Sequence, residues 1–316
     1  MKRFISIAVS VAILFIIYSK IDLQQLFGVF QDSNPFWMVV SLGMVIPITM
    51  VTSWRLQQLM PRAGTLDFLE ANRLILGASV LNMVLPSKMG DIAKSYFMKD
   101  RGHLSGTLSL SLVIFEKACD MLSLLLWCAF GLLLYPQKDE LFWVMTVAII
   151  AGLSIGLLIL GSQRFAQFFF RLAMAIAPKK LRQKLKNMEQ SWAEMHHYFW
   201  RDPKQLIKIS ATSIFIWFLH LLQIWLFILA LRAWTPFLVN LALSPLAILA
   251  GLLPLTFAGV GTRDAALIWF YQPYFNEEIG AALGILCTSR YFLPALIGLP
   301  FLGQMMAAVK QQKLAK

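Results

Sequence analysis

The sequence predicts an all-α fold, that of a polytopic helical membrane protein. Two inverted-topology repeats are expected, and each should contain a re-entrant broken helix. Hydrophobic residues make up 59% of the 316 residues, charged residues make up 14%, and the mean hydropathy is +0.68. Soluble domains carry about 25% charged residues, so this composition is typical of a chain surrounded by lipid. Two apolar runs, one in each half, stop early at a turn with proline and glycine, which indicates broken helices around a site within the membrane.

Six apolar runs are interpreted as membrane-spanning helices, because a hydrocarbon core about 30 Å thick needs roughly 20 apolar residues in helical conformation. They cover residues 4–18, 35–54, 104–135, 141–161, 207–231 and 280–309. Arg55, which follows the second run, is placed in a cytoplasmic loop. Of the cations in the predicted loops, only Lys20, Lys138 and Arg232 fall on the external side. The positive-inside rule therefore predicts a multi-pass protein of the inner (cytoplasmic) membrane with both termini in the cytoplasm.

The first interrupted segment covers residues 74–98. Leu74–Pro86 is apolar for only thirteen residues. These residues extend roughly 20 Å as a helix, so they cannot cross the hydrocarbon core. A turn with Gly90 follows, and residues 90–98 are the predicted returning half. We therefore expect this segment to enter from the cytoplasm and to return there.

The second interrupted segment covers residues 237–274. Its apolar run ends at Pro254, and the chain turns at Gly259-Val-Gly261 before a second helical pattern begins. It lies between an outward and an inward span, so it is expected to enter from the external side. The two segments thus have opposite orientations, which is the arrangement of inverted-topology repeats.

We expect one membrane domain, residues 1–316, whose two halves flank a basic cytoplasmic segment. The first half is residues 1–161 with its re-entrant segment 74–98, and the second is residues 207–316 with re-entrant segment 237–274. Residues 163–206 between them are basic and amphipathic. One face of the helix predicted there repeats apolar residues at alternating steps of four and three: Leu181, Leu185, Met188, Trp192, Met195 and Phe199. This helix is expected to lie on the membrane surface.

The net charge of +12 does not indicate nucleic-acid binding. Most of the excess lies in loops between apolar runs, as expected for cytoplasmic loops that face anionic lipid. The three cysteines, Cys119, Cys128 and Cys287, all lie in apolar runs and have no metal-ligand spacing. No metal ion or other cofactor is predicted.

Both turns carry residue types that bind anions. Glycine lets the backbone approach a ligand, and the helix after each turn points free N–H groups and its positive dipole end at the turn. Lysines at the first turn and an arginine at the second add positive charge, which suits a phosphate-bearing headgroup. The candidate substrate-binding residues are Asn82, Pro86, Ser87, Lys88, Gly90, Asp91, Lys94, Gly259, Gly261, Thr262, Arg263 and Asp264. Asp91 and Asp264 also have a simpler role available as caps of the following helices, which is compatible with a ligand.

A second candidate cluster consists of ionisable residues within the predicted spans. Glu116 and Asp120 are four residues apart and share a helix face, where two carboxylates alone would repel each other. Lys117 can reach Asp120, so we expect a further cation close to Glu116, with Arg290 and Arg263 as the candidates. This charge network either rearranges during transport or is a fixed set of ion pairs between helices, and the sequence leaves both open.

Three motifs resemble those of a known family. They are Asn82-x-x-Leu-Pro86-x-x-x-Gly90-Asp91-x-x-Lys94, then Glu116-Lys117-x-x-Asp120, then Gly259-x-Gly261-x-Arg263-Asp264-Ala-Ala-Leu. In this order and spacing they resemble the flippase-like membrane domain of lysylphosphatidylglycerol synthases and its stand-alone relatives, over about residues 4–308. Lys94 and Lys117 stand where that family usually has arginine, and Asp91 and Asp264 stand where it usually has glutamate. The sign of each charge is kept, but lysine is a point charge and lacks the arginine fork.

The resemblance implies a lipid flippase, with two re-entrant helices that meet near the membrane midplane and an anionic or aminoacylated headgroup that passes between the leaflets. The fused synthase domain of the larger family members is absent from this sequence, so the expected activity is transport and not an enzymatic reaction. The expected partner is a membrane phospholipid or a polyprenyl-phosphate lipid, with no nucleic acid. A homodimer is the assembly considered.

Two alternatives stay open. The first is an ion- or proton-coupled transporter of a small soluble anion, with Glu116 or Asp120 as the proton carrier, which predicts an aqueous cavity closed to lipid. The second is a membrane-embedded enzyme that acts on a lipid phosphate. It would need a nucleophile or a metal cluster at the break, where the sequence offers only Ser87 and scattered histidines.

Overall fold

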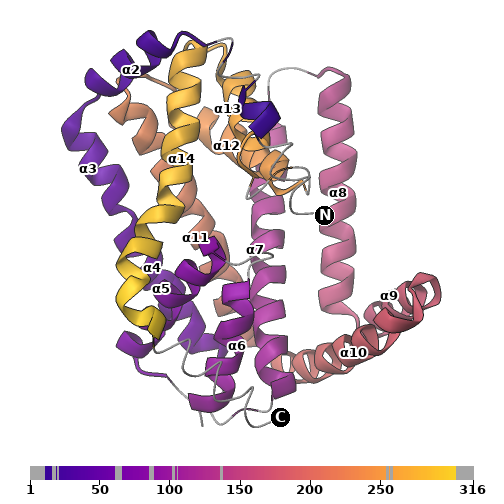
Figure 1. The fold of residues 1–316 in the computed structure, drawn as a ribbon. Coiled ribbons are helices and arrows are strands. Elements are labelled where there is room, and N and C mark those ends of the chain that lie inside the picture. Colours follow the sequence, from indigo (N-terminus) through magenta and orange to yellow (C-terminus); the bar gives the residue numbers. More distant parts are fainter. Residues whose placement is uncertain are drawn as a thin grey trace. The chain divides into compact units, whose positions relative to one another are not determined.

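The computed structural model is helical and contains no strand over the residues it describes, as the composition predicts (Figure 1). These residues are 11–15, 19, 21–60, 66–84, 89–101, 104, 106–135, 138–253, 256 and 259–303. The helices are α2 (Leu23–Gln31), α3 (Pro35–Gly43), α4 (Val45–Leu59), α5 (Phe68–Val84), α6 (Met89–Arg101), α7 (Gly106–Leu134), α8 (Glu140–Gly161), α9 (Gln163–Ile176), α10 (Lys179–Trp200), α11 (Pro203–Ala230), α12 (Phe237–Leu252), α13 (Thr262–Tyr271), α14 (Glu277–Gly298) and the 3-10 helix η4 (Leu299–Phe301).

The chain divides into two compact units. Unit 1 consists of Met1–Ile48, Leu124–Ile149 and Trp217–Leu293, and unit 2 consists of Thr49–Ser123, Ile150–Ile216 and Pro294–Lys316. Each unit combines segments from both halves of the sequence. Unit 2 contains α5 and α6, the helices of the first interrupted segment, and unit 1 contains α12 and α13, the helices of the second.

Five helical segments among the described residues are long and apolar enough to cross a membrane. They are Pro35–Leu59, Leu108–Leu134, Glu140–Gly161, Pro203–Ala230 and Glu277–Phe301. They coincide with the second to sixth predicted runs, which confirms the multi-pass helical class. The first predicted run, residues 4–18, lies mostly outside the described residues, as does the end of the last run.

The second span continues further than predicted. The amide of Met44 donates to the Val40 carbonyl at 3.1 Å, and its carbonyl accepts from Ile48 at 3.1 Å, so α3 and α4 follow each other without a loop. The helix then ends at Leu59, not at Trp54. Arg55 therefore lies within α4 and not in the cytoplasmic loop where the positive-inside rule placed it.

Two helices are not predicted as separate elements: α2 lies in the predicted external loop, and α9 forms the start of the basic amphipathic segment 163–206. Asp22 caps α2 within the predicted external loop, where its carboxylate accepts from the amide of Gln24 at 2.8 Å. Ser162 caps α9 in the same way, with a hydrogen bond from the Phe165 amide at 3.3 Å. Both are ordinary helix-start signals that the sequence carries.

The first interrupted segment consists of two separate helices, α5 and α6, that pack side by side (Figure 1). Helix α5 starts at Phe68, earlier than predicted, and its 17 residues extend about 26 Å. A Cβ at Gly90 would overlap the Ala78 carbonyl oxygen and lie 2.7 Å from the Asn82 Oδ1 atom, so only glycine lets α6 start this close to α5. Residues 85–88 of the turn lie outside the described part of the chain.

The second interrupted segment has the predicted break. Gly259 and Gly261 have φ angles of 76° and 100°, which residues with a Cβ rarely adopt. A Cβ at Gly259 would also lie 2.6 Å from the Gly251 carbonyl oxygen at the end of α12. The turn therefore needs glycine both for its backbone conformation and for its close packing.

The predicted apolar face of the basic segment is partly confirmed. Trp192, Met195 and Phe199 on α10 are buried in the core of unit 2, where the Phe199 ring stacks on that of Phe115 in α7 at 4.0 Å between centroids. Leu181, at the other end of the same face, is 49% exposed. Only the C-terminal half of this face is thus covered by protein.

Candidate functional site

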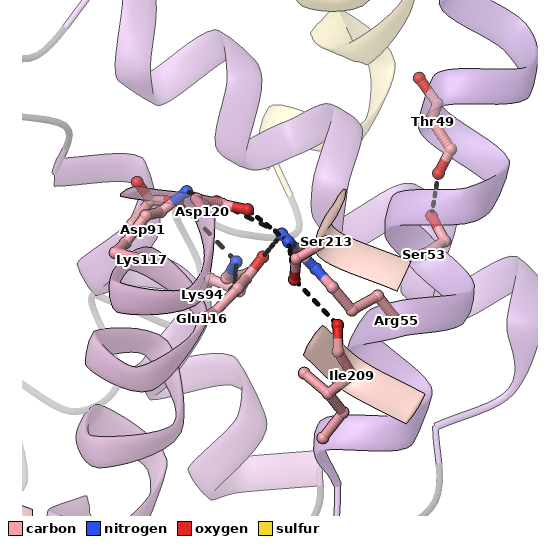
Figure 2. Close-up of polar contacts among 10 residues, drawn as sticks. All are labelled: Thr49, Ser53, Arg55, Asp91, Lys94, Glu116, Lys117, Asp120, Ile209 and Ser213. Atoms are coloured by element: carbon pink, nitrogen blue, oxygen red, sulfur yellow. Dashed lines mark hydrogen bonds and ion pairs between the residues drawn. The ribbon is translucent and has the colours of Figure 1, made fainter. Parts of the chain in front are cut away.

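Unit 2 contains a set of six charged residues on α4, α6 and α7, most of them buried, close to the first helix break (Figure 2). We call this set the Arg55 cluster; its members are Arg55, Asp91, Lys94, Glu116, Lys117 and Asp120. Three members were predicted as a charge network, and two were predicted as substrate ligands. The remaining one, Arg55, was placed in a loop.

Arg55 is the centre of this cluster. Its Nη2 atom donates to Glu116 Oε1 at 2.8 Å, and its guanidinium contacts both carboxylate oxygens of Asp120. Its Nη1 atom also donates to Ser213 Oγ on α11 at 2.9 Å. Arg55 is 2% exposed and Glu116 is 1% exposed, so these charges interact without screening by water. One arginine thus connects α4 to α7 and α11.

Lys94 and Lys117 complete the cluster from either side of Asp91. The Lys94 Nζ atom pairs with Glu116 Oε2 and lies 3.8 Å from Asp91 Oδ1. The Lys117 Nζ atom lies 3.4 Å from Asp91 Oδ1 and 3.7 Å from Asp120 Oδ2. The Lys94 side chain is 2% exposed, whereas that of Lys117 is 41% exposed. Lys117 is therefore the member of the cluster that solvent or a ligand can reach.

The charges of the Arg55 cluster cancel, because three cations face three carboxylates. Burying a charge is costly unless it is paired. Every charge of this cluster is paired, although the Arg55 Nε atom is buried without a hydrogen-bond partner among the described residues. The further cation predicted beside Glu116 and Asp120 is Arg55. The two residues predicted for that role, Arg263 and Arg290, lie in unit 1. Lys94 is held by Glu116 and so is not a free cation at the break.

The second break positions Arg263 and Asp264 at the start of α13. The Gly261 amide donates to Asp264 Oδ2 at 2.9 Å, so Asp264 caps α13 as one of its two expected roles requires. The other oxygen, Oδ1, accepts from Arg263 Nε at 3.1 Å and Nη2 at 2.7 Å. Arg263 is 2% exposed. The cap and the ion pair together fix the direction of the arginine side chain.

Helix α14 forms the other side of this site. Arg263 Nη2 also donates to the Gly284 carbonyl at 3.2 Å and to Thr288 Oγ1. A Cβ at Gly284 would lie 3.0 Å from the Asp264 side chain, so glycine is what lets α14 approach α13 here. Across the break, the Thr256 and Thr262 hydroxyls share a hydrogen bond at 2.9 Å. We call Arg263, Asp264, Thr288 and Arg290 the Arg263 site.

The remaining predicted residues are placed as follows. Asn82 is half-buried on α5 beside Gly90, and its Oδ1 atom is buried without a hydrogen-bond partner among the described residues. Pro86, Ser87 and Lys88 lie outside the described residues. Arg290 is buried on α14, in the same unit as Arg263.

Cysteine and metal chemistry receive no support from the described residues. Cys119, Cys128 and Cys287 are free and buried. In the part of the chain that the structure describes, no group of three or more His, Cys, Asp or Glu side chains could hold a metal ion. The charged side chains described at the two breaks are carboxylate, ammonium and guanidinium groups.

Arg55 is the residue that sequence reasoning missed. It comes directly after Trp54, which resembles an interfacial anchor, and the positive-inside rule assigns such an arginine to the adjacent loop. The available signal was the apolar and amide sequence that continues to Leu59, which favours one more helical turn and a half. The expectation of a missing cation beside Glu116 and Asp120 was the second signal.

Comparison with known proteins agrees with this architecture. The transmembrane region of lysylphosphatidylglycerol synthases matches residues 3–298. A UPF0104 membrane protein of Methanocaldococcus jannaschii is 21% identical over 316 aligned residues, which cover 94% of this chain and 93% of that protein. The family match extends over both helix breaks and the Arg55 cluster. This protein therefore belongs to the family of the transmembrane region of lysylphosphatidylglycerol synthases.

Proposed function

We propose that this protein is a flippase that moves a phosphate-bearing anionic or modified lipid headgroup between the leaflets of the inner membrane, with both termini in the cytoplasm. The family takes its name from synthases of an aminoacylated phospholipid, and the region shared with this chain is the transmembrane one. The activity proposed here is transport and not synthesis. The proposed cargo is a phospholipid or a polyprenyl-phosphate lipid.

The observation that carries the proposal is a difference in charge balance between the two breaks. In the Arg55 cluster, three cations and three carboxylates cancel. In the Arg263 site, Arg263 is paired with Asp264, but the buried guanidinium of Arg290 has no carboxylate partner among the described residues. A buried guanidinium without a carboxylate favours a ligand with an anionic oxygen. The anion is therefore expected at the second break.

The two interrupted helices give the proposal its geometry. Irregular backbone is tolerated at membrane depth only where protein or an aqueous cavity satisfies it, and broken helices in transporters mark the substrate path. Each break of this chain has glycine at a position where a Cβ would clash. We propose that both segments are re-entrant and that they belong to inverted-topology repeats. We further propose that the headgroup contacts Asn82, Gly90 and their neighbours at the first break, and Gly259, Gly261 and their neighbours at the second.

The Arg55 cluster has a different role in this proposal. Its buried members, Arg55, Lys94 and Glu116, hold helices together, because each has its charge matched inside the unit. Lys117 and Asp120 are partly exposed, with side chains 41% and 22% accessible. These two are the members that exchange partners when a headgroup passes.

The test is lipid movement in liposomes that contain the reconstituted full chain and a fluorescent phosphatidylglycerol. Arg263→Gln removes the guanidinium, and Arg263→Lys keeps the charge but not the fork. Arg232→Gln is the matched control, because Arg232 is an exposed arginine of the same unit in the loop before α12. We expect Arg263→Gln to abolish movement, Arg263→Lys to slow it and the control to leave it unchanged. Undiminished movement in both Arg263 variants would contradict the proposal.

The same preparation separates the alternatives. Uptake of radiolabelled inorganic phosphate into liposomes, without lipid movement, would favour a transporter of a small anion. A change in the mass of the labelled lipid after incubation would favour an enzyme. Lipid movement without phosphate uptake and without a change in lipid mass supports the flippase.

A further inference from the structure

Arg290 is a buried arginine that has no acidic partner among the described residues. It lies on α14 and is 5% exposed. Its Nη2 atom donates to the Tyr291 hydroxyl at 3.1 Å, and its guanidinium carbon lies 5.1 Å from the centroid of the Tyr291 ring. Its Nε and Nη1 atoms are buried and have no hydrogen-bond partner among the described residues. Arg290 forms no ion pair with any carboxylate in the described part of the chain.

Arg263 contacts the helix that carries Arg290. Its Nη2 atom donates to the Gly284 carbonyl and to Thr288 Oγ1 on α14, and Arg290 follows Thr288 by two residues. Arg263 contributes a third buried donor without a partner, its Nη1 atom. Among the described residues, Arg263 pairs with Asp264 and Arg290 pairs with no carboxylate, so one of the two buried positive charges has no ion pair.

This arrangement is incomplete as it stands. Charged groups inside proteins are paired, and buried N–H donors without a partner are rare, because each loses its hydrogen bonds to water. The Arg55 cluster, with equal numbers of cations and carboxylates, shows how the same chain compensates buried charge elsewhere. At the Arg263 site one positive charge and three donors remain for a ligand to match.

We propose that Arg290 and Arg263 together form an anion subsite that binds a phosphate group between α13 and α14. This deepens the proposed function and rests on it, because it names the group of the transported lipid that is bound and assigns Arg290 to the headgroup, not to the charge network with Glu116. A neutral polyol would leave the charge uncompensated. A phosphate offers several anionic oxygens, which suits donors that come from two separate guanidinium groups.

The test measures ligand-dependent thermal unfolding of the full chain in detergent micelles. Three probes are compared: dihexanoylphosphatidylglycerol, inorganic phosphate and dihexanoylglycerol, which lacks the phosphate. A ligand that binds only the folded protein raises the unfolding midpoint with concentration. We expect dihexanoylphosphatidylglycerol to raise the midpoint and dihexanoylglycerol not to. No rise with either phosphate-bearing probe would overturn the subsite.

Arg290→Gln is the informative variant. It removes the uncompensated charge, so the unfolding midpoint without ligand should stay equal or rise, while affinity for dihexanoylphosphatidylglycerol should fall about tenfold or more. A structural role for Arg290 predicts the opposite pair of results, a lower midpoint without ligand and unchanged affinity. Arg290→Lys should recover part of the affinity, and Arg232→Gln is again the control in the same unit.

The probes and variants distinguish a lipid phosphate from free phosphate. They also distinguish failure of the anion subsite from failure of the proposed flippase function. Equal stabilisation by inorganic phosphate supports the subsite but excludes a requirement for the lipid. Stabilisation by dihexanoylphosphatidylglycerol that is lost in Arg290→Gln, in a protein that moves no lipid, supports the subsite and contradicts the proposed function. Lipid movement that Arg290→Gln leaves intact, with unchanged affinity, contradicts the subsite alone.

Discussion

Arg55 on α4 and Glu116 on α7, 61 residues apart in sequence, form a buried ion pair of 2.8 Å. Each is also held by a second partner of opposite charge, Arg55 by Asp120 and Glu116 by Lys94. The pair is therefore the link between the first helix break, which carries Lys94, and two of the long helices.

Removing Arg55 should destabilise the protein strongly. Arg55→Leu leaves Asp120 without its guanidinium and Glu116 with Lys94 alone, and breaking one side of a buried pair typically costs about 3–5 kcal/mol. Thermal unfolding in detergent, followed by circular dichroism, measures the change. Arg164→Leu, which removes an exposed arginine of the same unit, is the control and should shift the midpoint little. An Arg55→Leu variant as stable as the control would show that the pair contributes nothing.

Gly90→Ala should separate α6 from α5. The added methyl group would overlap the Ala78 carbonyl oxygen of α5, and the backbone cannot move away without loss of the neighbouring packing. We expect a loss of roughly 1–3 kcal/mol or more in the free energy of unfolding. Gly106→Ala is the matched control, since its methyl group would only touch the flexible Lys99 side chain at 3.5 Å. Equal stability of the two variants would argue against close packing at Gly90.

Tyr271 joins α13 to α12 through a buried polar network. Its hydroxyl lies 2.8 Å from Ser244 Oγ and donates to Asn240 Oδ1 at 3.0 Å, and Asn240 Nδ2 donates to the Leu221 carbonyl at 2.9 Å. Tyr271→Phe removes one partner and leaves the others, which should cost about 1–2 kcal/mol. Unfolding midpoints of Tyr271→Phe and of Tyr274→Phe, a neighbouring tyrosine with a more exposed side chain, test this. A neutral Tyr271→Phe would mean that Ser244 and Asn240 satisfy each other.

Helix α9 should lie in the polar–apolar boundary of the membrane. Its 14 residues extend about 21 Å, too short to cross, and Phe168 and Leu172 are exposed beside the cations Arg164 and Arg171. An environment-sensitive fluorophore on Leu172→Cys should report an apolar setting in liposomes with phosphatidylglycerol, and Gln163→Cys should report water. Replacing both arginines by glutamine should weaken the Leu172 signal. Identical signals from both positions would contradict this placement.

His196 on α10 should make the protein less stable below neutral pH. Burial lowers the pKa of His196 from its ordinary value of 6.5, and the charge of His197 lowers it further, against a raising effect of a hydrogen bond with the Gly161 backbone. Because the folded state binds the proton less readily, the contribution is complete above about pH 6.5 and is lost as the pH falls to the folded pKa. Unfolding midpoints at pH 7.5 and at roughly pH 5 should therefore differ less in His196→Gln than in the wild type. His197→Gln removes one cause of the lowered pKa of His196 and should reduce the difference in part. A wild-type-like pH profile in His196→Gln would contradict the assignment.

The fold class and five of the six predicted spans follow from composition and the lengths of the apolar runs, because lipid requires long uninterrupted helices. The second break follows from Gly259 and Gly261, since only glycine adopts their φ angles without strain. Both are local properties, so one sequence is enough to predict them. Re-entrance and inverted repeats stay predictions, because they depend on where the membrane surface lies.

The polar sites were only partly predictable, because they depend on contacts between residues far apart in the sequence. Glu116 and Asp120 indicate by their spacing that a cation is needed, but nothing local says that it is Arg55, which comes from a helix 61 residues away. Lys94 looks like a free cation at the break until its pairing with Glu116 is known. Which buried charges are paired is decided by tertiary packing, and charge patterns along the chain do not contain it.

The charge balance of the two sites also determines which of them an electric field can act on. Moving a group with no net charge, such as the Arg55 cluster, across a membrane potential requires no electrical work. Moving one uncompensated charge across the full potential changes the free energy by about 2.3 kcal/mol per 100 mV. The Arg263 site with Arg290 is such a group, and a bound monoanion would make it neutral. In the proposed flippase, a membrane voltage would then act on the return of the site without cargo and not on its movement with cargo.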